Sequence, residues 1–277
     1  MTGSTIETTA GFVDQAHPAF FLLFEPVSTP TAHILYLPPF GEEMNRCRPL
    51  VADQARRFAR KGFSVAILDF YGTGESAGHL TDASLEVWRD NIVHLMERLL
   101  ARHQQPVYLW GCRLGALLAM DFLSVKPDRI RKLLLWQPVV SGSSFVTQLL
   151  RQRTASLMKN SEQAETTADM KLRLAAGQAL DVAGYRLGGE LMTALDQLEM
   201  NSSFDAVDLG HSLDIFWLEH TTDATSGIGP KSARTLAHLE QAGAQVVSSA
   251  FTGDPVWLLH KRGNCDDLLT KTERAAL

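Results

Sequence analysis

The stretch PVYLWGCRLGALLAM, residues 106–120, decides the fold of this chain. Residues 107–110 are a short apolar run typical of a buried strand, and residues 116–123 carry apolar side chains at helical spacing. Gly111 and Gly115 enclose the junction, where larger side chains would collide with the strand or the helix. The pattern therefore predicts a very tight strand–turn–helix unit.

The central residue of this turn is Arg113. A glycine two positions before and two positions after a central residue, between a strand and a helix, is the nucleophile elbow of α/β-hydrolases. In that elbow the central side chain is a nucleophile that points outward at the helix N-terminus. An arginine is neither nucleophilic nor deprotonable at neutral pH. The turn thus predicts the architecture of a serine hydrolase without its reacting atom.

The composition is that of a globular protein with a large core. The chain has 277 residues, of which 45% are hydrophobic and 21% charged. Its net charge of −5 argues against nucleic acid or an anionic membrane as the main partner. Residues 1–12 lack the pattern of a secretory signal, and no apolar run approaches the ~20 residues that span a bilayer. We therefore expect a cytoplasmic protein that binds no nucleic acid and has no membrane span.

The chain contains three cysteines, Cys47, Cys112 and Cys265. An odd number in a chain of this size does not form a disulfide framework and fits a reducing compartment. Their spacing is not that of metal ligands. We expect neither a metal nor a cofactor.

Strand-like and helix-like segments alternate along most of the chain. The expected strands are residues 19–25, 33–37, 64–68, 107–110, 131–137, 213–218 and 245–251, and the expected helices are residues 49–61, 82–102, 116–123, 232–241 and 266–276. Such alternation predicts a mostly parallel central sheet with helices on both faces, as in the α/β-hydrolase fold. Residues 69–76, DFYGTGES, are a second marker of that fold, because glycines let the loop after a strand fold against the end of the sheet.

The alternation stops after the expected strand at residues 131–137. Residues 140–209 contain no convincing strand, and residues 144–158, 167–180 and 189–198 have helical patterns. We expect residues 1–139 and 210–277 to form the core and residues 140–209 to form a helical cap over the site. An additional helical layer of the core is the alternative.

The sequence offers candidates for the acid of a catalytic triad but no histidine at the usual position. The acid should follow the strand at residues 213–218, where Glu219 is the first candidate and Asp223 the second. The histidine should fall near residues 253–256, which read Gly-Asp-Pro-Val, and His260 lies further on. Cys112 is intrinsically nucleophilic, but next to the central residue of an elbow it should pack beneath the turn. The catalytic residues therefore stay unknown, with Cys112, Glu219 and His260 as fallback candidates.

A covered Arg113 needs a negative partner, because a buried unpaired guanidinium is costly. Glu43 is the first choice, with Glu42 and Glu219 as alternatives. Backbone N–H groups of the loop near residue 41 and of the residue after the elbow would form an oxyanion hole. The expected ligand-binding residues are Arg113, Leu114, Phe40, Gly41, Glu42, Glu43, Asn45 and Arg46, and Arg48 would extend the same positive region.

Five segments together resemble a named family. They are PPFGEEMNRCR, DFYGTGES, WGCRLGALLA, WQPVVSGSSFVTQLLR and DVAGYRLGGEL, and they resemble the hydrolases of the second type associated with the exosortase A system. The resemblance implies an α/β-hydrolase fold, an arginine at the elbow and a context beside exosortase/PEP-CTERM sorting systems. The family is called hydrolase because of its fold, so the name does not establish a reaction. The C-terminal loop, GDPVWLLHKRGNCDDLL, departs from the G-x-x-F-W pattern of the family.

Three functional interpretations follow. The first is a hydrolase-fold protein that binds a small anionic or acyl-bearing molecule through Arg113 without a serine acyl-enzyme. The second is an active ester or thioester hydrolase that uses Cys112 or a water activated by Glu43 or Glu219. The third is a non-catalytic partner in an exosortase or polysaccharide system.

Overall fold

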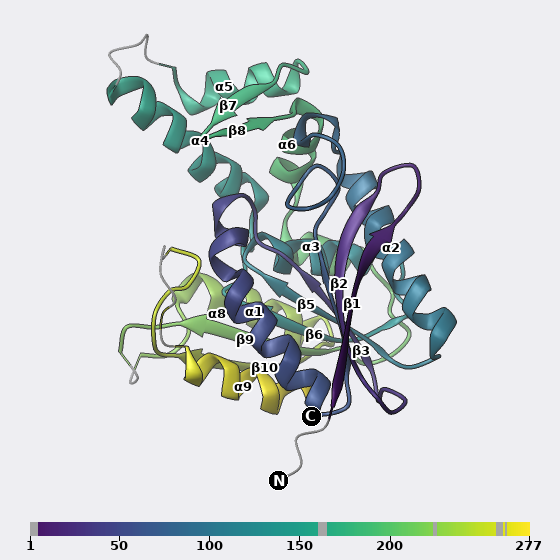
Figure 1. Ribbon diagram of the computed structural model, residues 1–277. Helices are drawn as coiled ribbons and strands as arrows, with labels where there is room; N and C mark the ends of the chain where they lie inside the picture. Colours follow the sequence, from purple (N-terminus) through teal and green to yellow (C-terminus); the bar gives the residue numbers. More distant parts are fainter. Residues whose placement is uncertain (1–4, 160–164, 224–225, 259–262, 264) are drawn as a thin grey trace.

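The computed structural model describes residues 5–159, 165–223, 226–258, 263 and 265–277. Its centre is an eight-stranded sheet in the order β1-β2-β4-β3-β5-β6-β9-β10 (Figure 1). The strands are β1 (Ile6–Val13), β2 (Ala19–Pro26), β3 (His33–Leu37), β4 (Ser64–Leu68), β5 (Val107–Cys112), β6 (Ile130–Trp136), β9 (Asp214–His220) and β10 (Gln245–Phe251). Only the β1–β2 and β2–β4 pairs are antiparallel; the strands from β4 to β10 are paired in parallel. The expected α/β-hydrolase fold class is confirmed.

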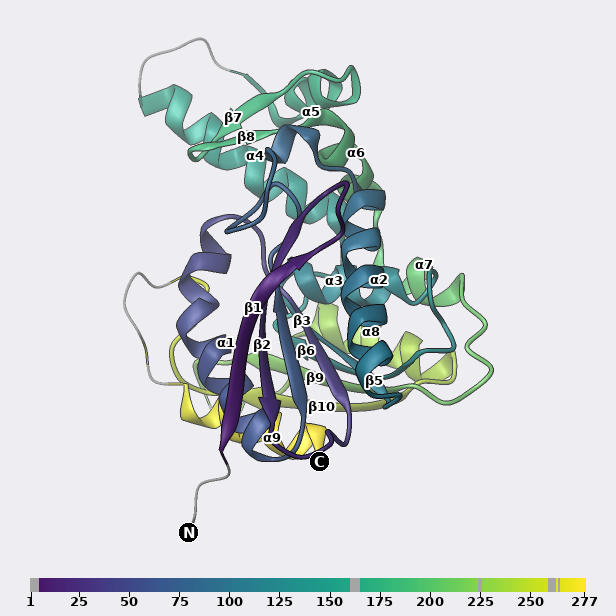
Figure 2. The same ribbon diagram turned by 45° about the vertical axis from the view of Figure 1, so that its right-hand side comes forward.

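Helices cover both faces of the sheet, and each face has its own apolar core. The core helices are α1 (Glu42–Arg60), α2 (Leu85–Arg102), α3 (Leu114–Phe122), α8 (Pro230–Gln241) and α9 (Asp266–Ala276). Along β3, Ile34 and Tyr36 pack in the cluster with α1 and α9, whereas Leu35 and Leu37 pack with α2, α3 and α8. This alternation follows from the two-residue period of a strand, and it makes every residue of β3 buried. Figure 2 shows α1 on one side of the sheet and α2 on the other.

Most of residues 140–209 lie beyond one end of the sheet, whereas their last helix, α7 (Met200–Asp205), lies against α3 and α8 of the core (Figures 1 and 2). Before α7 they contain α4 (Gly142–Lys159), α5 (Thr167–Ala175), β7 (Leu180–Val182), β8 (Tyr185–Leu187) and α6 (Gly189–Gln197). We call this segment the insertion. Its division from the core at these boundaries stays a prediction.

Two expectations for the insertion were wrong. The helix predicted to reach residue 180 ends at Ala175, and a two-stranded hairpin follows it. The hairpin turns at Ala183 and Gly184, whose φ angles of 50° and 86° are those of a two-residue turn that joins twisted strands. Three-residue strands are too short to show a period in the sequence, so the hairpin could not be found from its apolar pattern.

The start of α1 also differs from the expectation. The helix begins at Glu42 rather than near residue 49, and Pro49 lies inside it with its side chain exposed. A proline near a helix start is the usual pattern, which placed the predicted start too late. The earlier start matters for the site, because it puts Glu42 and Glu43 in the first turn of α1. Among the described residues no helix is both long and apolar enough to cross a membrane.

Candidate functional site

The elbow has the backbone of a nucleophile elbow with arginine at its centre. Arg113 joins β5 to α3 with φ 55° and ψ −114°, a conformation that L-residues rarely adopt. Its N–H donates to the carbonyl of Trp136 at 2.9 Å. A Cβ on Gly111 would lie 2.5 Å from Cα of Ala116, and one on Gly115 would overlap the carbonyl oxygen of Leu37. Glycine is therefore required at both positions, as the sequence pattern indicated.

Arg113 is paired with Glu43, the partner that the sequence analysis expected first. Nε lies 3.2 Å from Oε2 and 3.4 Å from Oε1, and Nη2 lies 3.3 Å from Oε1. These contacts are longer than the 2.7–2.9 Å typical of charge-assisted bonds. The side chains of Arg113 and Glu43 keep 17% and 23% of their surface exposed. The pair is loose, and Nη1 of Arg113 has no acceptor among the described residues.

An aromatic ring from the loop after β10 lies next to Arg113. Trp257 lies in the loop after β10, and its ring centroid is 5.8 Å from Cζ of Arg113, a cation–π contact. The carbonyl of Trp257 accepts a bond from Nη1 of Arg46 at 3.3 Å. His260 lies outside the described residues. Of the loop that follows β10, the described part thus gives the guanidinium an apolar support and not a base.

Glu219 does not face Arg113, contrary to the alternative considered for it. Its Oε2 accepts from Trp217 Nε1 at 3.1 Å and its Oε1 accepts from the backbone N–H of Gly229 at 3.1 Å. The carboxylate therefore anchors the segment before α8 to β9. Its neighbour His220 is held by its own N–H on Gln137 Oε1 (2.6 Å) and by Nε2 on the carbonyl of Gly253 (2.8 Å). Both residues organise the strand ends beside the site.

Glu42 is engaged by the insertion rather than by Arg113. The phenol of Tyr185 on β8 donates to Oε1 of Glu42 at 2.8 Å, and Asn45 Nδ2 approaches the same oxygen at 3.4 Å. Burial, together with the hydrogen bond to the Glu42 carboxylate and the charge of that group, raises the pKa of Tyr185 to about 12. The neutral phenol is thereby favoured as a donor. This bond ties the hairpin of the insertion to the first turn of α1.

A cavity of about 260 Å³ lies over the elbow. Its polar floor comes from the start of α1 and the elbow, and its other wall comes from α4 and the β7–β8 hairpin. The lining residues are Phe40, Gly41, Glu42, Glu43, Arg46, Arg113, Phe145, Gln148, Leu149, Gln152, Ala183, Tyr185 and Leu258. We call it the Arg113 pocket. The structure thus brings six of the eight expected ligand-binding residues to one cavity; Asn45 lines a neighbouring one, and Leu114 begins α3 below the turn.

Two helices begin at this pocket without a side-chain cap. Gly41 precedes α1 and Arg113 precedes α3, and neither offers a side chain to the first amides of its helix. The N–H of Leu114 is the first amide of α3, so it has no acceptor inside the helix. Uncapped helix N-termini favour negative or polar oxygen atoms. The pocket therefore combines a guanidinium with helix starts on one side and apolar side chains on the other.

Cys112 is separated from the pocket. Its side chain is fully buried, as is that of Cys47 on α1. A hydrogen bond with Cys112 and burial raise the pKa of the Cys47 thiol well above its usual range. Buried neutral thiols are unreactive. Cys112 packs beneath the turn, which weighs against its role as a nucleophile.

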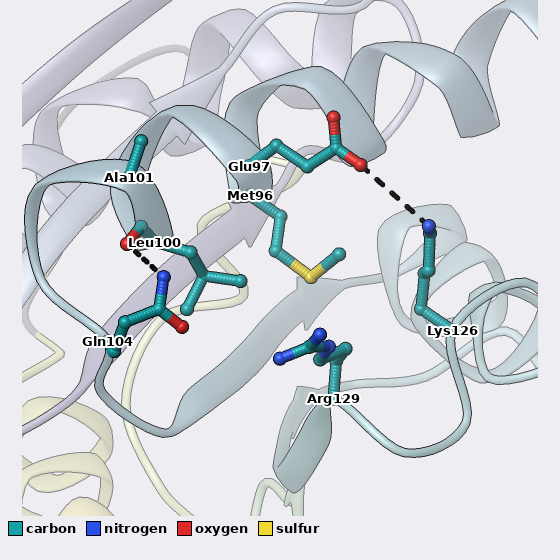
Figure 3. A pocket seen from close by; sticks show the side chains of 7 residues that line it. All are labelled: Met96, Glu97, Leu100, Ala101, Gln104, Lys126 and Arg129. Carbon is teal, nitrogen blue, oxygen red and sulfur yellow. Dashed lines mark hydrogen bonds and ion pairs between the residues drawn. The ribbon is translucent and has the colours of Figure 1, made fainter.

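A further depression, of about 290 Å³, lies far from the elbow, between the end of α2 and the segment that follows α3 (Figure 3). Figure 3 shows Glu97 and Lys126 across it, with Nζ and Oε1 3.8 Å apart, and Arg129 at its edge. It contains no residue of the elbow and no strained backbone. We take it as ordinary surface and use it below as a source of control variants.

The sequence reasoning missed the residues that the insertion contributes to the pocket. Phe145 and Leu149 are four residues apart on α4, and Tyr185 comes from the unpredicted hairpin. The i, i+4 spacing of Phe145 and Leu149 was visible as one helix face but did not say which surface it would cover. No pattern in the sequence indicated that Trp257 would contact Arg113.

Comparison with known proteins agrees with this geometry. Residues 28–180 match the model of the Hydrolase_4 family, described as serine aminopeptidase, S33. That is more than half of the chain. The chain belongs to this family. No curated protein matches the chain in sequence.

Solved structures with the same fold include enzymes that act on esters. Est1E from Butyrivibrio proteoclasticus with bound ferulic acid has a TM-score of 0.65 at 16% identity, with 96% of each chain covered. A lipase in its open form has a TM-score of 0.64 at 17% identity, covering 98% of this chain and 99% of that one. A highly thermostable carboxyl esterase from Bacillus coagulans in complex with glycerol has a TM-score of 0.60 at 14% identity, with 90% of each chain covered. At these identities the likeness establishes the fold alone.

Proposed function

We propose that this hydrolase-fold protein binds an acyl-bearing molecule, as a carboxylate or an ester, in the Arg113 pocket without forming a serine acyl-enzyme. One observation carries the proposal: the position of the nucleophile holds a guanidinium that lines a cavity and is only loosely paired. An elbow built for covalent chemistry would place a hydroxyl or thiol there.

The chemistry of the pocket favours such a ligand. Nη1 of Arg113 and the first amide of α3 are donors that suit the oxygen of a carbonyl or carboxylate. Phe145, Leu149 and Leu258 offer an apolar wall to a hydrocarbon chain. Glu43 balances the charge of Arg113 while the pocket is empty, so the guanidinium is tolerated before a ligand arrives.

The test compares two molecules with the same chain length, octanoate and octanol, by isothermal titration calorimetry. Octanoate should bind more tightly, because it adds a charge-assisted bond to Arg113. Arg113→Met should weaken octanoate binding by about tenfold or more and leave octanol unchanged. Arg129→Met is the matched control, because it removes an exposed arginine outside the pocket (Figure 3).

Equal affinities for octanoate and octanol, or an octanoate affinity that Arg113→Met leaves unchanged, would overturn the proposal. Covalent chemistry is checked on the same samples. Fluorophosphonate probes should label no serine, and turnover of p-nitrophenyl octanoate should stay at background and be unaffected by Cys112→Ala. Stoichiometric labelling or Cys112-dependent turnover would restore the interpretation as an active esterase.

The cellular setting is a separate proposal that rests on the resemblance of the five sequence segments. We propose a cytoplasmic protein that works beside an exosortase or polysaccharide system. Fractionation of cells that produce the tagged chain tests the location. Loss of sorted or secreted product on deletion of the gene, restored by the wild-type chain, tests the context.

A further inference from the structure

A second cavity, of about 300 Å³, adjoins the Arg113 pocket. It lies between the first turns of α1 and the loop of residues 72–75 that follows β4. Phe40, Gly41 and Tyr185 line both cavities. These three residues therefore form the wall between them. We call the second cavity the Arg48 chamber.

The polar groups of the Arg48 chamber are mixed donors and acceptors, and their summed charge is negative, because one arginine, Arg48, is accompanied by the carboxylates of Asp69 and Glu75. Nη2 of Arg48 contacts both oxygens of buried Asp69, at 3.1 and 2.9 Å. Nε and Nη1 of Arg48 then have no acceptor among the described residues. Asn45 and Glu75 add an amide and a carboxylate from opposite sides. Because Asp69 neutralises Arg48, this arrangement suits uncharged hydroxyl groups, each of which donates and accepts, better than an anion.

The loop closes on the chamber only because it contains glycine. Gly72 and Gly74 have φ angles of 78° and 53°, and a Cβ on Gly74 would lie 2.9 Å from Nη2 of Arg48 and overlap Asp69. Asp69 also accepts the backbone N–H of Glu75 at 3.0 Å. The Asp69 carboxylate thus holds the loop on one side of the chamber and Arg48 on the other.

The wall between the cavities is aromatic and held by one hydrogen bond. The rings of Phe40 and Tyr185 lie 6.4 Å apart, and the Tyr185 phenol is bound to Glu42. A ring-shaped or branched polar group in the chamber would meet these aromatic faces on one side and hydrogen-bonding groups on the other. Because the two cavities share these lining residues, the chamber lies within reach of the alcohol part of a molecule whose acyl part is at Arg113.

We propose that the Arg48 chamber binds the hydroxyl-rich alcohol part, a glycerol or a sugar residue, of the ligand whose acyl part occupies the Arg113 pocket. This inference rests on the proposed function for the position of the acyl part. The ligand is thus an ester of a fatty acid with a polyol, bound uncleaved.

The experiment measures the affinity of three octanoyl esters below their micelle-forming concentrations by isothermal titration calorimetry. Monooctanoylglycerol and octanoyl glucose carry hydroxyl groups, and methyl octanoate lacks them. At least one of the first two should bind about tenfold more tightly than methyl octanoate, as expected for one or two net hydrogen bonds. The glycerol and sugar arms show which alcohol the chamber takes.

Variants locate the effect. Glu75→Ala should reduce the advantage of the hydroxylated esters and leave octanoate binding unchanged. The Glu75 side chain is exposed, so the fold should tolerate the change, and the melting temperature checks this. Glu97→Ala is the matched control, because it removes an exposed carboxylate remote from both cavities.

The outcomes separate the two proposals. If octanoate binds through Arg113 but all three esters bind equally, the chamber proposal is wrong and the proposed function stands. If a hydroxylated ester binds and Glu75→Ala weakens its binding while octanoate does not bind, the chamber proposal stands and the proposed binding at Arg113 is overturned. If neither octanoate nor any ester binds, both are overturned.

Discussion

Two arginine–carboxylate pairs, Arg48–Asp69 and Arg113–Glu43, each include a residue of α1, and they differ in the length of their contacts and in the burial of the carboxylate. Asp69 keeps only 2% of its side-chain surface exposed, against 36% for Arg48, and contacts Arg48 at 2.9 and 3.1 Å. Arg113 and Glu43 are 3.2–3.4 Å apart and both remain partly exposed to a cavity. The first pair also holds the backbone N–H of Glu75, whereas Glu43 holds only Arg113 among the described residues. The difference indicates that Arg48–Asp69 stabilises the fold and that Arg113–Glu43 can open for a ligand.

The largest expected effect comes from breaking the Arg48–Asp69 pair. Asp69→Asn should lower the free energy of unfolding by ~3 kcal/mol, because it removes the charge opposite Arg48 and weakens an acceptor for the loop. Urea denaturation measures the loss. Asp128→Asn, which changes an exposed carboxylate 3.6 Å from Arg129, should cost less than ~0.5 kcal/mol. Equal losses in the two variants would contradict the structural role of Asp69.

Breaking the loose pair should cost less and improve binding. Glu43→Gln should lower the free energy of unfolding by only ~1 kcal/mol, because the Arg113–Glu43 contacts are long and both side chains keep some access to solvent. The same variant should bind octanoate several-fold more tightly, since the carboxylate that competes for Arg113 is gone. Calorimetry with octanoate and urea denaturation give the two readouts. A loss as large as that of Asp69→Asn, with weaker binding, would mean that Arg113–Glu43 is structural.

The smallest effect concerns the wall between the two cavities. The folded-state pKa of Tyr185, about 12, lies above its usual value of 10.0, so the neutral phenol contributes stability below pH 10 that is lost as the pH rises through about 12. An ultraviolet titration of wild type minus Tyr185→Phe should show one phenol that ionises near pH 12. A difference spectrum with a midpoint near 10 would mean that the Glu42 bond does not persist in solution.

The elbow and its counter-ion were accessible from the sequence because local sterics determine them. Gly111 and Gly115 have steric reasons to be glycine that hold wherever the turn occurs. Glu43 followed from the rule that the loop after the first parallel strand crosses the mouth of the site. In both cases neighbouring elements of the sheet fix the geometry.

The rest of the site depends on long-range packing that no local pattern encodes. The β7–β8 hairpin is too short to have a readable period, yet it supplies Tyr185, which lines both cavities. Glu219 is at the position expected for a catalytic acid, but its carboxylate accepts hydrogen bonds from Trp217 and Gly229. Position along the chain placed this carboxylate correctly and could not reveal its hydrogen-bond partners.

The most direct test of the central claim follows the two arginines in one sample by nitrogen-15 NMR of their side chains. The Nε–H resonances of Arg113 and Arg48 are assigned by loss of signal in Arg113→Met and Arg48→Lys. Addition of octanoate should shift the Arg113 resonance, because the ligand displaces or shares its contact with Glu43, and should leave Arg48 unchanged. An Arg113 resonance that stays fixed while octanoate shifts signals elsewhere would contradict the account.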